Sequence, residues 1–542
     1  SIAMSSKSQY SEVDVEEILK KMATVNLRIT KTSRWQSLMF VLLAAYNIFG
    51  AAANFTDFFF MDSNYTCWIP DNVSMTDAIP IISDGTFSKC EVYRNFNKTT
   101  NDIIKCPMGY RHSLPSAETL IATFNLYCDR EHLKDYPQAA FQLGVFLGSI
   151  ICAITGDKFG RKPLVLGAYW VTIAAGIGCA ISNSIWLFSF FRLVCGICFQ
   201  VYGLSCFVMA VELFATEDRA VPCVYMNLLW SAGMLLLDLV AYSVRNLRWV
   251  YAVTYASVIV TIPYYFIVPE SICWLAVNGK IVEVNRILKK AYRINKTPEG
   301  EQIYAKAPIS INPGEDEVFT VLEQTDNNDE SEVATPSIRH PKQKFRDLYN
   351  ESVINLKKLV ASKPFIYAFL CVSLFQLSSN FSYLGLTLSA SSFSDNYYLN
   401  WFITTMVEVP GVILSGPLLN VLGRKYPCIF CHLIWAIMAA VFAFVQNVTA
   451  LNVLNHASKF MVVVTYSVIW LYAPELFPTR YRGFACGITN SFAKFAAIFS
   501  AFFESFLTKH RMPLMLSLSI GSLILSVLTI FLPDTNEQTL QE

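Results

Sequence analysis

Charged residues are scarce in this sequence. Asp, Glu, Lys and Arg make up 15% of its 542 residues, whereas 54% are hydrophobic. A water-soluble domain carries about 25% charged residues, so the composition excludes that class and predicts a membrane protein. The net charge of +1 is too small to attract nucleic acid, and none is expected as a partner.

Several motifs are missing as well. The chain has no G-x-x-x-x-G-K-[ST] phosphate loop, which argues against ATP hydrolysis. No constellation of nucleophiles or metal ligands stands out, so we expect neither an enzyme nor a bound metal or other cofactor. Nothing at the N-terminus resembles a cleaved signal, and the first apolar run is expected to direct insertion itself.

Long apolar runs are plentiful instead. A helix needs about 20 mostly apolar residues to cross a hydrocarbon core of about 30 Å. Two groups of six such runs predict an all-α membrane protein with twelve membrane-spanning helices in two six-helix bundles. The predicted spans lie near residues 35–60, 136–155, 163–183, 186–211, 220–244, 249–269, 363–386, 397–420, 426–446, 450–473, 483–507 and 512–532.

The rest of the chain is arranged around the two bundles. Residues 1–34 precede the first bundle (35–269), and residues 533–542 follow the second (362–532). The polar segment 270–361 between them has a centre with too few apolar residues to fold, and that centre is predicted to be disordered. Its two ends, NGKIVEVNRILKK and FRDLYNESVINLKKL, have helical apolar spacing and predict short amphipathic helices. The segment is either a plain linker or a regulatory element.

Basic residues in the short loops set the orientation. They concentrate on one side of the membrane, which is therefore predicted to be cytoplasmic, together with both termini. The richer side has Lys158, Arg161, Lys162, Arg219, Arg424, Lys425, Arg480 and Arg482, and the poorer side has Arg245, Arg248, Lys509 and Arg511.

The largest loop on the poorer side, residues 61–135, supports this orientation. Disulfides and N-glycans both belong to an oxidising exterior, so the loop is predicted to be extracellular, disulfide-linked and glycosylated. Four cysteines allow three pairings, which the sequence leaves open. The cysteines are Cys67, Cys90, Cys106 and Cys128, and the sequons begin at Asn64, Asn72 and Asn97.

An internal repeat relates the two bundles. GDKFGRK (156–162) aligns with LNVLGRK (419–425), and VELFATEDRA (211–220) aligns with PELFPTRYRG (474–483). Both alignments have the same offset of 263 residues, which predicts two copies of one six-helix unit.

These motifs resemble the major facilitator superfamily, in which an acidic-basic-x-Gly-Arg-Lys turn follows the second and eighth spans. The resemblance implies charge pairs that latch the cytoplasmic side when it is closed. The alternative is that these charges only satisfy topology. The pairs expected are Asp157 and Arg161 with Glu212 and Arg219, and Arg424 with Glu475, with Arg482 as the repeat of Arg219.

Further motifs narrow the resemblance. TFNLYCDREHL (123–133), VPESICWLAVNGK (268–280) and YAPELFPTRYRG (472–483) are similar to the solute carrier family of organic anion, cation and zwitterion transporters. The resemblance implies polyspecific movement of small organic ions across the plasma membrane by alternating access. A monomer is expected.

Two charges stand alone in apolar runs. Lys494 lies eleven residues into its span from the cytoplasmic side, and Glu408 lies eleven residues into its span from the outside. At about 1.5 Å per residue both are about 16 Å deep, near the bilayer midplane. Because a buried charge there costs on the order of 3 kcal/mol, the two either pair with each other or flank the substrate cavity. A purely structural pair is the alternative.

Asp238 contrasts with these two charges. It stands eighteen residues into the fifth span, about 27 Å from the cytoplasmic start. Snorkelling to the outer headgroups or pairing with Arg245 is the expected explanation, and Asp238 is not among the candidate site residues.

The family resemblance bears on substrate charge. At the position of Lys494, anion and carnitine-type members usually carry a basic residue, and cation members carry an aspartate. A second basic residue usual in anion members, four positions after Glu408, is Val412 here. The expected substrate is therefore a monoanion or a zwitterion.

The same resemblance implies other cavity residues, mostly aromatic, which suit bulky organic guests. Lipid-facing or core roles are the alternative for each of them. The candidates are Asn54, Phe207, Trp230, Gln376, Tyr383, Tyr466, Trp470 and Asn490.

Three functions stay open. The first is a transporter of organic anions or zwitterions, and the second is an organic cation carrier that uses Glu408. The third is a membrane sensor or scaffold that keeps the fold without transport. Motifs retained in both repeats favour a transporter.

Overall fold

The computed structural model forms two compact units, one comprising Gln36–Trp274 and Tyr367–Glu542 and the other comprising Ser1–Trp35 and Leu275–Ile366. The structure describes residues 34–56, 65–81, 87–98, 102–112, 119–214, 220–256, 264–277, 280–295, 363–389, 397–477 and 482–533.

The first half of the chain is helical outside one loop region. The helices before and after that region are long and apolar, as the spans predict. They are α2 (Arg34–Ala44), α3 (Tyr46–Phe55), α6 (Tyr136–Phe159), α7 (Arg161–Ile181), α8 (Ile185–Glu212), α9 (Ala220–Val244), α10 (Leu247–Ala256), α11 (Tyr264–Ile267) and α12 (Ile272–Val277).

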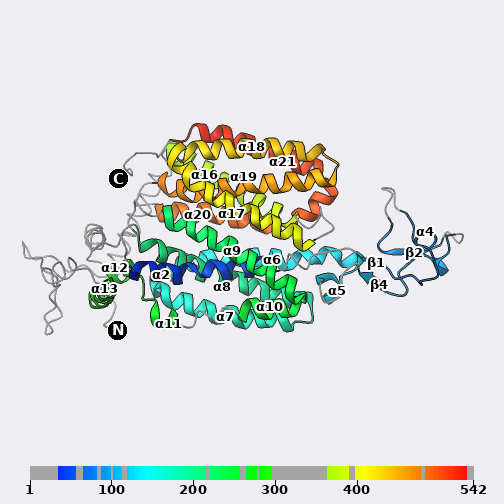
Figure 1. Cartoon of the computed structure of the whole chain (residues 1–542), viewed down its shortest axis with the longest axis horizontal. Coiled ribbons are helices and arrows are strands. Elements are labelled where there is room, and N and C mark those ends of the chain that lie inside the picture. The colour runs from blue at the N-terminus through cyan, green and yellow to red at the C-terminus, as the bar shows by residue number, and fades with distance from the viewer. Residues whose placement is uncertain are drawn as a thin grey trace, which may run out of the picture. The chain divides into compact units, whose positions relative to one another are not determined.

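The second half repeats this pattern of long helices (Figure 1). Each of the twelve predicted spans falls on one or two described helices, and eight helices are long and apolar enough to cross a membrane by length and composition alone. The last helix bends at His510, where φ is −135° and ψ is 42°. The second-half helices are α16 (Lys363–Leu388), α17 (Tyr397–Leu422), α18 (Lys425–Phe444), α19 (Val448–Glu475), α20 (Arg482–Ser500) and α21 (Phe503–Ile530).

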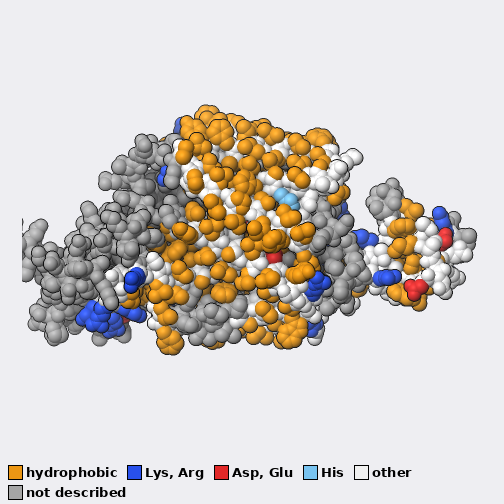
Figure 2. Space-filling model, in the orientation of Figure 1, with side chains coloured by type: hydrophobic (Ala, Val, Ile, Leu, Met, Phe, Trp, Pro, Cys, Tyr) orange, Lys and Arg blue, Asp and Glu red, His pale blue; other side chains and the backbone are white. Residues whose placement is uncertain are grey.

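The surface of these helices is apolar. In the face shown in Figure 2, hydrophobic side chains cover most of the described helices and few charges interrupt them. Large side chains such as Trp170, Trp186, Phe190 and Phe444 are more than half exposed. A contiguous apolar surface of this size suits contact with lipid tails.

The repeated Gly-Arg-Lys motifs form equivalent turns. Gly160 joins α6 to α7 with a φ of 93°, and Gly423 joins α17 to α18 with a φ of 73°. A residue with a Cβ rarely adopts positive φ, which explains why glycine stands at both turns. The internal repeat thus places a glycine with positive φ at the same point in both halves.

Helices α6 and α8 pack closely because of a missing side chain. A Cβ on Gly144 of α6 would lie 2.1 Å from the Leu193 carbonyl oxygen of α8. In a membrane, small residues at such contacts let two backbones approach and gain dispersion contact.

We predict that Gly144→Leu separates α6 from α8 and lowers the amount of folded protein severalfold, because the backbone of α8 has to move. Gly167→Leu is the control, since nothing lies within 4 Å of a Cβ at Gly167. Size-exclusion profiles of detergent extracts measure the folded fraction. Equal loss in both variants would contradict the packing argument.

Between α3 and α6 the chain forms a disulfide-linked region, called the loop domain below. Strands β1 (Tyr65–Cys67) and β4 (Tyr110–His112) pair antiparallel, as do β2 (Glu91–Tyr93) and β3 (Ile103–Lys105). The disulfides are Cys67–Cys106 and Cys90–Cys128, which is one of the three pairings left open. Its short helices are α4 (Met75–Ala78), η3 (Arg94–Phe96), α5 (Leu120–Phe124) and η6 (Cys128–Asp135).

The other unit contains one described amphipathic helix, α13 (Ile281–Asn295), where NGKIVEVNRILKK predicts one. The Asn295 side chain accepts a hydrogen bond of 2.9 Å from the Trp35 backbone N–H. The predicted disordered centre and the second amphipathic helix lie outside the described residues.

Of the three predicted glycosylation sites in the loop region between α3 and α6, Asn72 and Asn97 are exposed, and Asn64 lies outside the described residues.

Candidate functional site

A buried ion pair lies in the second half of the chain. Lys459 Nζ on α19 is 2.9 Å from Glu408 Oε1 on α17, and these side chains are 0% and 2% exposed. Glu408 is eleven residues after the start of α17, and Lys459 is eleven residues after the start of α19. Both helices start on the same side, so the two charges lie at the same depth, about 16 Å along each helix.

The lysine is held by one segment of α16. Its ammonium donates to the Tyr383 carbonyl at 3.2 Å and to the Thr387 hydroxyl. It also lies 3.5 Å from the centre of the Tyr383 ring. A desolvated ammonium gains from the ring face as well as from the carboxylate, so Tyr383 helps to offset the cost of burial.

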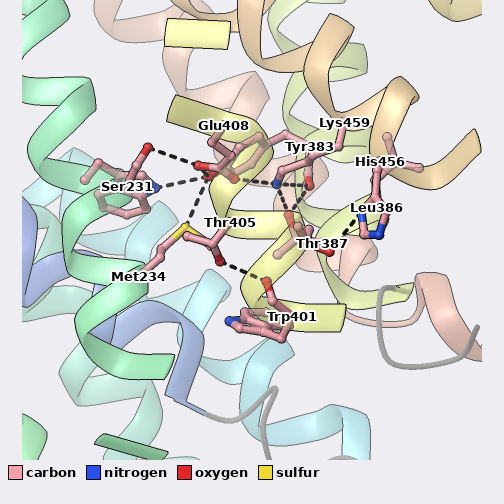
Figure 3. Close-up of polar contacts among 12 residues, drawn as sticks. Ser231, Met234, Tyr383, Leu386, Thr387, Trp401, Thr405, Glu408, His456 and Lys459 are labelled. Carbon is pink, nitrogen blue, oxygen red and sulfur yellow. Dashed lines mark hydrogen bonds and ion pairs between the residues drawn. The ribbon is translucent and has the colours of Figure 1, made fainter. Parts of the chain in front are cut away.

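The carboxylate connects the two halves of the chain (Figure 3). Glu408 Oε2 accepts hydrogen bonds from the Ser231 hydroxyl on α9 at 3.4 Å and from the Tyr383 hydroxyl at 3.3 Å. Trp230, also on α9, donates its indole N–H to the Tyr383 oxygen at 3.1 Å. The ion pair is therefore the centre of a polar network that joins α9 to α16 and α17.

An aromatic cluster extends from this network. Tyr466 stacks on Tyr383 with ring centres 5.5 Å apart and contacts Trp470, whose centre is 6.1 Å away. Phe207 of α8 lies 5.9 Å from Trp470, again across the two halves. Five predicted aromatic residues, Trp230 included, thus form one connected group with Glu408.

The partner of Glu408 is Lys459 and not Lys494, so pairing between Glu408 and Lys494 is wrong. Depth along a helix gives the height of a charge but not its neighbour, and both lysines stand at mid-depth. Lys459 is also a lone charge in the apolar run 450–473, and the argument applied to Lys494 identifies it equally well. Lys459 is nevertheless absent from the predicted site residues.

Lys494 lies on α20 and is half-buried. It shares a helix face with Asn490 and Ile498, which are also half-buried. On one side of this face lie the buried Ala493 and Ala497, and on the other lies the exposed ring of Phe495. Among the described residues it has no ion-pair partner.

Two predicted amides lie apart from the cluster. Asn54 is 7% exposed, and its side-chain oxygen accepts from Gln142 of α6 at 3.0 Å. Gln376 shares the α16 face of Tyr383 and is 6% exposed, and its Oε1 has no hydrogen-bond partner among the described residues. These contacts give Asn54 a packing role within the first half.

Arg192 on α8 is a fully buried cation that the sequence analysis missed. Its guanidinium donates to the Ala53 carbonyl at 2.8 Å, to the Asn54 carbonyl at 3.3 Å and to Gln138 Oε1 at 2.9 Å. These carbonyls belong to the last turn of α3, where a cation satisfies unpaired backbone oxygens.

The expectation for Asp238 is wrong. Asp238 is 6% exposed, so it does not snorkel, and its carboxylate has no ion-pair partner among the described residues. Arg245 does not pair with it, because its guanidinium lies over the rings of Tyr242 and Tyr398, 4.9 and 5.7 Å from their centres.

The gating motifs of the first half meet on the opposite side from the loop domain. Arg161 pairs with Glu212 at 3.1 Å, and Ser271 donates to the same carboxylate at 2.6 Å. Glu270 accepts from the backbone N–H groups of Arg161 and Lys162 at 3.0 and 3.1 Å and so caps α7. All these contacts lie within the first half, so they do not join the two halves themselves.

The other predicted latch residues are only partly visible. Arg424 is half-buried at the start of α18. Arg219 and the side chains of Asp157, Glu475 and Arg482 lie outside the described residues. The latch stays a prediction.

Comparison with known proteins identifies the family. The profile of the Major Facilitator Superfamily matches residues 135–501. The chain belongs to the major facilitator superfamily. The predicted twelve-helix, two-bundle architecture is confirmed, and this facilitator is a multi-pass membrane transporter of a non-enzymatic family.

Relatives of the facilitator are similar at low identity. It is 24% identical over 457 residues to organic anion transporter 3 of Sus scrofa, covering 82% of this chain and 77% of that one. It is 26% identical over 462 residues to solute carrier family 22 member 7 of Mus musculus, covering 80% and 79%. An organic cation transporter-like protein of Drosophila melanogaster is 24% identical over 448 residues, covering 82% and 75%.

Solved structures agree on the fold. The inward-open xylose transporter XylE from E. coli aligns with a TM-score of 0.54 and 14% identity over 93% of this chain and 98% of that one. XylE bound to 6-bromo-6-deoxy-D-glucose aligns with a TM-score of 0.58 and 15% identity over the same shares.

We predict that Lys459→Met in the facilitator lowers the free energy of unfolding by about 3–5 kcal/mol, because it leaves the Glu408 carboxylate buried and unpaired. The double variant Lys459→Met with Glu408→Gln recovers part of that loss. Thermal unfolding in detergent measures both, with Lys509→Met on the exposed start of the last span as control. A double variant as unstable as the sum of the single ones would contradict the pairing.

Proposed function

We propose that this facilitator is a secondary transporter that moves small organic anions or zwitterions across the plasma membrane by alternating access. The aromatic cluster with Glu408 and Lys459 forms one wall of the substrate site. Lys494 provides the charge that selects the substrate.

The sign of the substrate's charge is inferred from one observation. Lys459 neutralises Glu408 at 2.9 Å, so the pair contributes no net charge to the site. Lys494, half-buried at the same depth, then remains as a positive charge without an ion-pair partner among the described residues. A charge-assisted hydrogen bond from an ammonium to a carboxylate or sulfonate contributes about 1.5–3 kcal/mol, enough to favour anions about tenfold or more.

The relatives support the substrate class at a coarser level. Organic anion transporter 3 and the organic cation transporter-like protein both carry organic ions by name. Between the two, the paired state of Glu408 argues against an organic cation carrier, because such a carrier needs that carboxylate unpaired. Cross-half contacts such as Trp230 with Tyr383 support a transporter over a static scaffold, since alternating access has to break and remake them.

We predict that Lys494→Ala lowers uptake of benzenesulfonate about tenfold and that Lys494→Asp lowers it further, because the field at the site loses and then reverses its sign. Uptake into proteoliposomes is measured for benzenesulfonate, betaine and tetraethylammonium. Lys509→Ala, an exposed lysine of α21, is the control.

The outcomes distinguish the functions. Wild-type protein that takes up tetraethylammonium but not benzenesulfonate would favour the cation carrier. A folded protein that takes up none of the three and shows no stimulation by substrate on the opposite side would favour the scaffold. If neither Lys494 variant alters uptake or selectivity, Lys494 is not in the site.

Orientation is part of the proposal, with the loop domain outside and both termini inside. We predict that Asn72→Gln and Asn97→Gln each increase electrophoretic mobility by the mass of one glycan in cells, because both sequons are exposed. Glycosidase treatment of wild-type protein gives the reference. Asn380→Gln is the control, since Asn380 is 4% exposed inside α16. No shift in either loop variant would contradict an outside loop domain.

A further inference from the structure

Asp238 is a buried acid at the boundary between the two halves. It lies on α9, which packs against α17. Ser231 donates to Glu408. Met234 and Asp238 follow Ser231 at helical spacing and lie on the same face of α9. On α17, which runs antiparallel to α9, Thr405 and Trp401 precede Glu408 at the same spacing. Asp238 is therefore opposite Thr405 and Trp401, about 10 Å from the ion pair toward the loop-domain end.

The acid has no counter-charge in this position. No cation pairs with either carboxylate oxygen among the described residues. The polar neighbour on α17 is the neutral Thr405 hydroxyl, which donates to the Trp401 carbonyl at 3.2 Å. The charged group that acts on it from α17 is Glu408, which has the same sign. An unpaired carboxylate in an apolar interior costs several kcal/mol, and the protonated acid does not carry that cost.

The charged groups on the helices packed against α9 are already engaged with other partners. Arg192 of α8 holds the carbonyls of α3, Glu212 of α8 pairs with Arg161, and Arg248 of α10 donates to Asn183 at 3.0 Å. Described residues of α3 include no charged side chain. Other titratable groups on these helices include Tyr46 on α3, Cys195, Cys198, Tyr202 and Cys206 on α8, Tyr251 and Tyr255 on α10, Tyr398 and Glu408 on α17, and His456, Lys459, Tyr466 and Tyr472 on α19. The His456 ring contacts Asn400 and Thr404.

Aromatic residues close this interface at the loop-domain end. The rings of Tyr242 on α9 and Tyr398 on α17 meet edge to face, with centres 5.7 Å apart. Arg245 covers both rings. At the same end Ser505 of α21 donates to Asp135 at 2.6 Å, so a second contact also holds the two halves together.

We propose that Asp238 is a proton-binding site, which opens to water when the loop-domain ends of α9 and α17 separate and closes when Tyr242 and Tyr398 meet. In the open state the carboxylate is hydrated and exchanges one proton with water. Closure requires the protonated form, because no cation enters with it. The halves therefore close at this end only with one proton bound, which couples proton movement to the transport cycle. This coupling rests on the proposed function, whereas the binding of the proton does not.

The first test is independent of transport. Dicyclohexylcarbodiimide reacts with protonated carboxyl groups in apolar surroundings, and we expect it to label Asp238 in the full chain in proteoliposomes at about pH 6, with less labelling at about pH 8. Peptide mass spectrometry locates the label. Asp238→Asn removes it, and Asp71→Asn in the loop domain leaves it unchanged. No label on Asp238 overturns the proposal.

The second test measures coupling. Benzenesulfonate stays ionised at both pH values, so a pH effect on its uptake belongs to the protein. We expect wild-type uptake to change severalfold between about pH 6 and about pH 8, and the ratio of the two rates to fall to about one in Asp238→Asn. Asp238→Glu retains the carboxyl and keeps a pH dependence with a shifted midpoint, which separates loss of the proton site from loss of folding.

The two tests fail in different ways. A labelled Asp238 together with wild-type pH dependence in Asp238→Asn overturns the coupling. If wild-type protein transports none of the three probes, the proposed function fails, and the labelling alone then decides whether Asp238 binds a proton.

Discussion

The ion pair between Glu408 and Lys459 is the constraint on which the site depends. Two charges at the bilayer midplane are tolerated only because each offsets the desolvation of the other and because Tyr383, Thr387 and Ser231 satisfy the remaining donors and acceptors. The hydroxyl and ring of Tyr383 are thereby fixed, and with them the stacked Tyr466. Without the pair, Glu408 no longer holds the Ser231 hydroxyl of α9 and the Tyr383 hydroxyl of α16 together.

The sequence predicts the frame of the protein well because the bilayer simplifies the problem. Length and apolarity alone decide which segments cross, so the spans fall on the helices found, and the glycines at 160 and 423 mark the same turn in each half. The bend at His510 also has a local signal, because Pro513 lacks the N–H that would bond to the Lys509 carbonyl one turn earlier.

The site is predictable in height but not in pairing. Spacing along a helix places Glu408, Lys459 and Lys494 at one depth, and it places Tyr466 and Trp470 on one face. Which lysine meets Glu408 depends on how α17, α19 and α20 are arranged around it, and that is a tertiary property. The same limit explains Asp238, because a position near a helix end looks exposed until α17 covers it.

Two pairs of equivalent positions show how the duplicated halves differ. One pair makes a similar contact in both halves, and the other pair does not. Arg192 of α8 and Asn455 of α19 are 263 residues apart. Both donate to carbonyls near the end of the first span of their half: Arg192 to Ala53 of α3 and Asn455 to Leu386 of α16, the latter at 3.2 Å. The residue equivalent to Lys459 is Gly196, whose missing side chain lets α8 approach the Phe141 carbonyl. The first half thus has close helix packing where the second half has its central charge. The site is therefore asymmetric although the two halves repeat one fold. One position cannot both exclude a side chain, as at Gly196, and surround a charged one, as at Lys459.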